Sequence, residues 1–96
     1  MINVPQDHLL TIKRMLQNHV PDVEVRAFGS RVSGTIKEYS DLDLVIVGEF
    51  KIDPKVLMQL KDDFEESDIP FRVEILDWHS ISDEFRRIIE QRYEVI

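Results

Sequence analysis

The strongest constraint in this sequence is a pair of carboxylates at the head of an otherwise apolar run. Residues 29–47 read GSRVSGTIKEYSDLDLVIV, with Asp41 and Asp43 one position apart. In a strand, residues i and i+2 point to the same side and lie about 6.6 Å apart. The two carboxylates therefore share one face, and burying them without a counter-charge would cost several kcal/mol. A fold that keeps this arrangement needs a cation or a donor beside it.

The rest of the chain alternates helical and strand patterns. In chain order, we predict a helix between Pro5 and Pro21, a strand at 23–28, a short helical turn from Ser30, a strand at 42–47, a helix from Pro54, a strand at 71–76 and a helix opened by Ser80 or Ser82. Leu60 and Phe64 should face the core, as should Ile88 and Ile89 of the last helix. The order predicts an α/β (α+β) fold with a small mixed sheet of about three strands and about four helices, in a single domain spanning 1–96.

A glycine–serine pair before the carboxylates indicates a phosphate site. Gly29 ends the first strand, and a backbone without a Cβ can approach a phosphate closely. Ser30 begins a helical turn, where a hydroxyl and backbone amides can donate to phosphate oxygens. Arg31 and Lys37 add positive charge nearby. These four residues are the predicted nucleotide-binding group.

Glu74 is the only carboxylate on the outward face of the third predicted strand. If that strand lies beside the second, Glu74 joins Asp41 and Asp43 in a triad of catalytic, metal-binding carboxylates. Oxygen ligands select Mg²⁺, Mn²⁺ or Ca²⁺ over zinc, and two ions about 4 Å apart can bridge the attacking and leaving oxygens of an in-line displacement. The alternative is structural: Asp41 caps a backbone amide, Asp43 pairs with a basic side chain, and Glu74 pairs with Arg72 or Arg26.

Composition limits the partners and the compartment. With 12 basic and 19 acidic residues, the chain carries a net charge of −7, which argues against direct nucleic-acid binding. No apolar run approaches the ~20 residues of a membrane span, the N-terminal segment has no signal-peptide core, and cysteine is absent. We therefore expect a cytoplasmic protein. With 96 residues there is little room for an acceptor-binding lobe, so a large acceptor must be held by a second copy, as a homo-oligomer, or by another protein.

The GS pair, the ten residues after it and the DLD triplet together resemble the signature of the minimal nucleotidyltransferases, MNT-type proteins of the DNA polymerase beta superfamily. The later PFRVEILDW and EFRRIIEQRYEVI are similar to the family's third strand and last helix. The resemblance implies a nucleotidyltransferase fold and transfer of AMP from magnesium-bound ATP. It assigns Gly29 and Ser30 to the triphosphate, Asp41 and Asp43 to the metal ions, and Glu74 to the third carboxylate.

Many short members of this family resemble the antitoxin half of HEPN–MNT toxin–antitoxin pairs, which adenylylates a tyrosine of a HEPN ribonuclease. The resemblance thus implies a HEPN-type toxin as partner. The family more often has aspartate where this chain has Glu74, and the extra methylene moves the carboxylate by about 1 Å or more. Two other interpretations stay open: a module that neutralises its partner by binding alone, and a subunit that transfers nucleotide to a small molecule.

Overall fold

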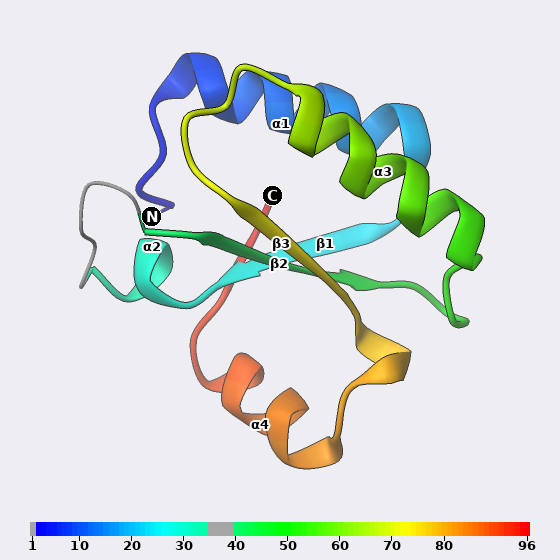
Figure 1. The fold of residues 1–96 in the computed structure, drawn as a ribbon. Coiled ribbons are helices and arrows are strands. Elements are labelled where there is room, and N and C mark those ends of the chain that lie inside the picture. Colours follow the sequence, from blue (N-terminus) through cyan, green and yellow to red (C-terminus); the bar gives the residue numbers. More distant parts are fainter. Residues whose placement is uncertain (1, 35–39) are drawn as a thin grey trace.

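The computed structural model describes residues 2–34 and 40–96. In chain order its elements are α1 (Gln6–His19), β1 (Glu24–Phe28), α2 (Ser30–Ser33), β2 (Leu42–Val47), α3 (Pro54–Glu66), β3 (Val73–Asp77), the 3-10 turn η1 (Trp78–Ser80), α4 (Asp83–Gln91) and β4 (Glu94–Val95). Helices α1 and α3 cover one face of the sheet, and α4 lies on the opposite face (Figure 1). In this described part of the chain, no helix combines the length and apolar character needed to cross a bilayer.

The strands form one mixed sheet in the order β3-β2-β1-β4. Strand β2 pairs in parallel with β3, and β1 pairs antiparallel with both β2 and β4. The predicted fold class is confirmed, and the expected neighbours β2 and β3 do lie side by side. The sheet also contains a fourth strand, β4, beyond the three expected. Strand β4 has only two residues, and its pairing with β1 is long-range. A strand this short shows no alternation from which it could be predicted.

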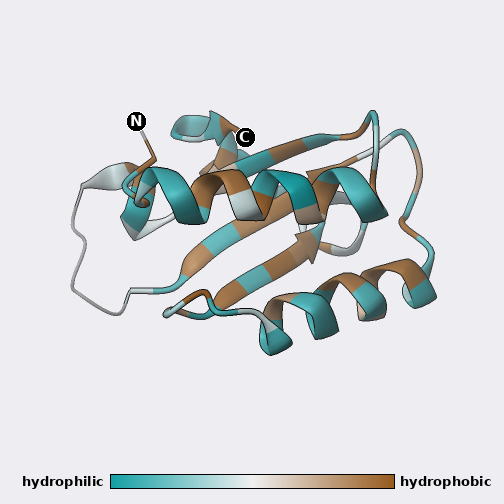
Figure 2. Cartoon of the chain, turned by 90° about the horizontal axis from the view of Figure 1, so that it is seen from above, coloured by the Kyte–Doolittle hydropathy of each residue, from teal (hydrophilic) through white to brown (hydrophobic). Residues whose placement is uncertain are grey.

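The main core lies between the sheet and the pair α1 and α3. The buried side chains that meet there include Ile12 and Leu16 of α1, Leu60 and Phe64 of α3, and Leu42, Leu44 and Ile46 of β2. Figure 2 shows mostly apolar strands beneath two helices that alternate polar and apolar residues. Because successive strand residues point to opposite faces, Asp43 and Val45 face the α4 side. Because the main core lies on the α1 and α3 side, the Asp43 carboxylate lies on the α4 side of the sheet.

Helix α4 covers part of that second face. The Ser82 side chain caps it by accepting a hydrogen bond from the Phe85 backbone N–H at 3.1 Å. The Phe85 ring meets Phe28 of β1 edge-to-face, with centroids 5.7 Å apart, and Ile89 is 1% exposed. The prediction that Ile88 also packs inward is wrong, since Ile88 is 61% exposed. Adjacent helix residues point about 100° apart, and the rotation of α4 that turns Ile89 toward the sheet turns Ile88 toward solvent.

Asp77 at the end of β3 is a buried carboxylate that the sequence analysis did not single out. It is 4% exposed and accepts hydrogen bonds from the backbone N–H groups of Ile52, at 3.0 Å, and His79, at 3.1 Å. These bonds join the loop before α3 to the end of β3. An aspartate directly after an apolar strand and before a short turn is the available sequence signal for such a cap.

Candidate functional site

Asp43 lies at the centre of the predicted site. In the sheet register, Phe28 of β1 and Glu74 of β3 stand on either side of Asp43 in β2. Gly29 follows Phe28, and a Cβ built on Gly29 would lie 2.3 Å from the Asp43 Oδ2 atom. The structure therefore brings together one residue of the predicted phosphate turn and two of the three predicted carboxylates, with Asp41 at the entry to β2.

The charge around Asp43 is not balanced. Burial raises the pKa of the Asp43 carboxyl above its ordinary value, and the negative charges of Asp41 and Glu74 raise this pKa further. A bound cation beside Asp43 would relieve both the repulsion from its acidic neighbours and the cost of its burial. The electrostatics support the predicted metal role of these residues, which stays a prediction.

Glu74 is engaged by a neighbour on its own strand. Its Oε2 atom lies 2.9 Å from Nη2 of Arg72, with side chains 39% and 72% exposed respectively. The alternative of an Arg72 pair is thus observed, whereas Arg26 pairs with Glu24. An ion pair this exposed contributes at most about 1 kcal/mol, so a ligand that prefers Glu74 can displace it. The pair leaves Glu74 available to the site.

A divalent cation fits the donor set. Asp41, Asp43 and Glu74 offer only carboxylate oxygens, which suit Mg²⁺ or Mn²⁺. Within residues 2–34 and 40–96, no three acidic or histidine side chains are yet grouped closely enough to hold an ion as they stand. Magnesium usually keeps several waters and shares its coordination with substrate phosphates, so such sites are completed when nucleotide binds.

The Gly29–Ser30 turn has a backbone shape suited to close approach. Gly29 has φ 81° and ψ −157°, a region that essentially only glycine occupies. Its carbonyl accepts hydrogen bonds from the N–H groups of Val32, at 3.0 Å, and Ser33, at 2.9 Å, which hold the first turn of α2. Half-buried Ser30 is the first residue of α2, as predicted. Because Gly29 has no Cβ, the turn can lie close to the Asp43 carboxylate.

The side chain of Arg31 is buried and bonded to two backbone carbonyls. Its side chain is 4% exposed, and it donates from Nε to the Ser40 carbonyl and from Nη1 to the Asn3 carbonyl, both at 2.8 Å. The guanidinium also stacks over the Phe71 ring, 3.9 Å from its centroid. Burial lowers the pKa of Arg31, and the charge of Asp41 opposes this change. These contacts favour a positioning role beside the carboxylates, and nucleotide contact stays a prediction. The predicted nucleotide contact of Lys37 lies outside the described residues.

We expect Arg31→Lys to lower the free energy of unfolding by about 1.5–3 kcal/mol, because one ammonium cannot bond both carbonyls and stack on Phe71. Urea denaturation measures this, with Arg14→Lys on the exposed face of α1 as the matched control. If Arg31 instead served mainly as a phosphate ligand, the variant would lose ATP affinity at unchanged stability.

The comparisons with known proteins agree with this geometry. The sequence profile described as polymerase beta, nucleotidyltransferase matches residues 11–96. A Haemophilus influenzae protein named "Probable protein adenylyltransferase MntA" is 47% identical over 95 residues, which cover 99% of this chain and 83% of that protein.

Two solved structures share the fold. A toxin–antitoxin crystal structure with AMP-PNP superposes with a TM-score of 0.74 at 21% identity, covering 90% of this chain and 69% of that one. A chain from the complex of a tri-AMPylated Shewanella oneidensis HEPN toxin with an MNT antitoxin superposes with a TM-score of 0.69 at 19% identity, covering 94% and 69%. The profile match and the 47% identity show that this chain belongs to the polymerase beta nucleotidyltransferase family.

Proposed function

We propose that this protein is a protein adenylyltransferase that moves AMP from ATP to a hydroxyl group of a partner protein. The observation that carries the proposal is the close approach of Gly29 to Asp43, a carboxylate that has Asp41 and Glu74 as acidic neighbours. It joins a glycine turn suited to phosphate with a cluster of carboxylates in need of a cation. The relative that is 47% identical and named a probable protein adenylyltransferase supports the same reaction.

The residues on the two sides of Asp43 have different roles in this proposal. Gly29 and Ser30 bind the triphosphate, the glycine through close backbone approach and the serine through its hydroxyl. Lys37 adds positive charge to the same group. Arg31 joins the segment before α1 to the residues before β2 through the Asn3 and Ser40 carbonyls.

Asp41, Asp43 and Glu74 would hold two Mg²⁺ ions, or Mn²⁺. The ions, when bound, neutralise charge on the phosphates and lower the pKa of the attacking hydroxyl. The chain's own contribution is to hold Asp43 of β2 in register with Glu74 of β3, with Asp41 at the entry to β2. The acceptor hydroxyl loses its proton to solvent and its oxygen bonds to the α-phosphorus, while pyrophosphate leaves with the electron pair of the broken P–O bond.

The acceptor belongs to another protein in this proposal. The helices and strands form one sheet and the helices that cover it. Within the described residues there is no separate acceptor lobe. The structural relatives include MNT antitoxin in complex with a tri-AMPylated HEPN toxin. We therefore propose a HEPN-type toxin as the partner, addition of more than one AMP to it, and the cytoplasm as the compartment.

Labelled ATP tests the reaction type. With the HEPN-type partner, we expect label from α-phosphate-labelled ATP, and none from γ-labelled ATP, to appear on the partner. Glu74→Ala should lower transfer by about a hundredfold while largely sparing ATP binding, because Asp41, Asp43 and the Gly29 turn remain. Glu90→Ala, an exposed acid on α4, is the matched control.

Two outcomes would contradict this proposal. Label from γ-ATP on the partner would indicate kinase chemistry instead. Silencing of the partner without any α-label, and equally well by Glu74→Ala, would favour the module that acts by binding alone.

A further inference from the structure

Arg72 stands directly before β3, beside the carboxylates of the proposed site. Its backbone carbonyl accepts a hydrogen bond from the Leu42 N–H at 2.9 Å. The parallel register that follows, Leu42 with Val73 and Asp43 with Glu74, continues this alignment. Pairing of the two segments therefore fixes the Arg72 backbone next to Leu42, the residue that separates the two aspartates.

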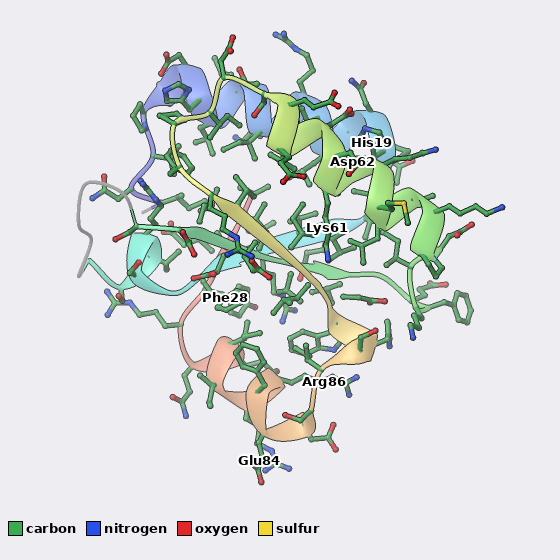
Figure 3. The ribbon with its side chains drawn as sticks, viewed as in Figure 1. His19, Phe28, Lys61, Asp62, Glu84 and Arg86 are labelled. Carbon is green, nitrogen blue, oxygen red and sulfur yellow. The ribbon has the colours of Figure 1, made fainter. Side chains whose placement is uncertain are left out.

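The side chains of Arg72 and Glu74 lie on the face of the sheet that carries Asp43. Residues paired across strands point to the same face, and Asp43 is paired with Glu74 on one side and with Phe28 on the other. Figure 3 shows Phe28 on the α4 side of the sheet, where its ring meets Phe85. The Nη2 atom of Arg72 lies 2.9 Å from Oε2 of Glu74. Of the ion pairs formed within the described part of the chain, this one alone includes a predicted metal ligand.

Glu74 is a predicted ligand that needs a restraint. Its side chain is 39% exposed on the outermost strand, and the carboxylate ends a chain of three rotatable bonds. An unrestrained glutamate changes rotamer, and a displacement of about 1 Å already slows an active site strongly. The ion pair uses Oε2, and a carboxylate has a second oxygen that can bind a cation. Arg72 can thus hold Glu74 in one rotamer without closing it to a metal ion.

We infer that Arg72 is a positioning residue, which orients Glu74 toward the metal site shared with Asp43. Side chains that bond a metal ligand from outside the coordination shell commonly fix the direction of that ligand. This inference rests on the proposed function and adds a residue to it. Because the pair is exposed, its effect on the rate is modest, about fivefold, which corresponds to the roughly 1 kcal/mol of such pairs. In this role Arg72 touches neither the nucleotide nor the acceptor.

The rotamer of Glu74 tests the inference without metal or substrate. In the metal-free protein, the three-bond NMR couplings of the Glu74 side-chain protons should report one predominant rotamer. In Arg72→Gln, which keeps a polar side chain and removes the charge, these couplings should become averaged over several rotamers. Arg87→Gln, at an exposed arginine of α4, is the matched control and should leave them unchanged. Equal averaging in wild type and Arg72→Gln would overturn the inference.

Transfer kinetics test the consequence for the reaction. With α-labelled ATP, Mg²⁺ and a HEPN-type partner, Arg72→Gln should lower kcat about fivefold and leave the KM for ATP unchanged. Arg72→Lys should recover most of the rate, because the pair uses a single nitrogen. In a Glu74→Ala background, Arg72→Gln should cause no further loss, since the group that it orients is gone.

The contrary outcomes point to different conclusions. A raised KM for ATP in Arg72→Gln would indicate direct contact with the nucleotide, and a further loss in the Glu74→Ala background would indicate a separate role; either result would overturn the inference. A wild-type protein that transfers no label would defeat the proposed function instead, while the couplings would still decide whether Arg72 orients Glu74.

Discussion

Asp43→Asn is expected to lower AMP transfer by about a thousandfold or more, equivalent to roughly 4 kcal/mol of transition-state stabilisation. The amide keeps the size of the side chain and removes its charge, so the loss reports on the carboxylate alone. Asp43 stands between Gly29 and Glu74, and no other side chain can take its place without moving β2. Transfer assays with α-labelled ATP measure the loss, with Asp62→Asn, an exposed acid on α3, as the matched control.

The same variant should be more stable than wild type in metal-free buffer at neutral pH. The raised pKa of Asp43 means that the folded state disfavours its charged form, so ionisation there costs stability. This cost is absent below the ordinary pKa of 3.8, grows as the pH rises toward the folded-state pKa, and is full above it. The stability gain of Asp43→Asn should therefore vanish in acid and shrink when Mg²⁺ and nucleotide are added. Thermal unfolding measured across pH tests this expectation. A variant less stable than wild type at neutral pH would contradict the proposed charge cluster.

Gly29→Ala is expected to destabilise the fold by about 2–4 kcal/mol and to abolish measurable binding of α,β-methylene-ATP with Mg²⁺. Two separate causes act at this position. The backbone angles, φ 81° and ψ −157°, are ones that residues with a Cβ scarcely adopt. The added methyl carbon would also lie 2.3 Å from Asp43 Oδ2 and 3.3 Å from its Cγ, so either the turn or the carboxylate must move.

Gly34→Ala is the control that separates these causes. Gly34 also has a positive φ, 91°, but a Cβ there would meet no atom of the described residues within 4 Å. Its substitution should cost only about 1 kcal/mol of backbone strain and should leave ATP binding intact. Urea denaturation and calorimetry on both variants give the comparison. If Gly29→Ala lost no more stability and no more ATP binding than Gly34→Ala, the close approach of the turn to Asp43 would not be needed for function.

Much of the fold was predictable because its signals are local. Proline and aspartate at 53–54 begin α3 where predicted, with the Asp53 side chain accepting from the Lys55 N–H. The β2 strand has the predicted bounds because its six residues are apolar apart from Asp43. Strand β4 could not be predicted in the same way, since its two residues depend on pairing with β1. The exposure of Ile88 likewise depends on how α4 is rotated against the sheet.

The sequence by itself determined which residues are predicted to carry the chemistry: the glycine–serine turn, the paired aspartates and the single outward carboxylate of β3. Those residue types at those spacings together suit phosphate and metal binding. Only the tertiary structure decided how they meet, because the parallel pairing that aligns Asp43 with Glu74 joins segments about thirty residues apart. It also turned Arg31 inward, where its side chain donates to the Ser40 and Asn3 carbonyls. Such placements follow from packing across the whole chain, which no local pattern encodes.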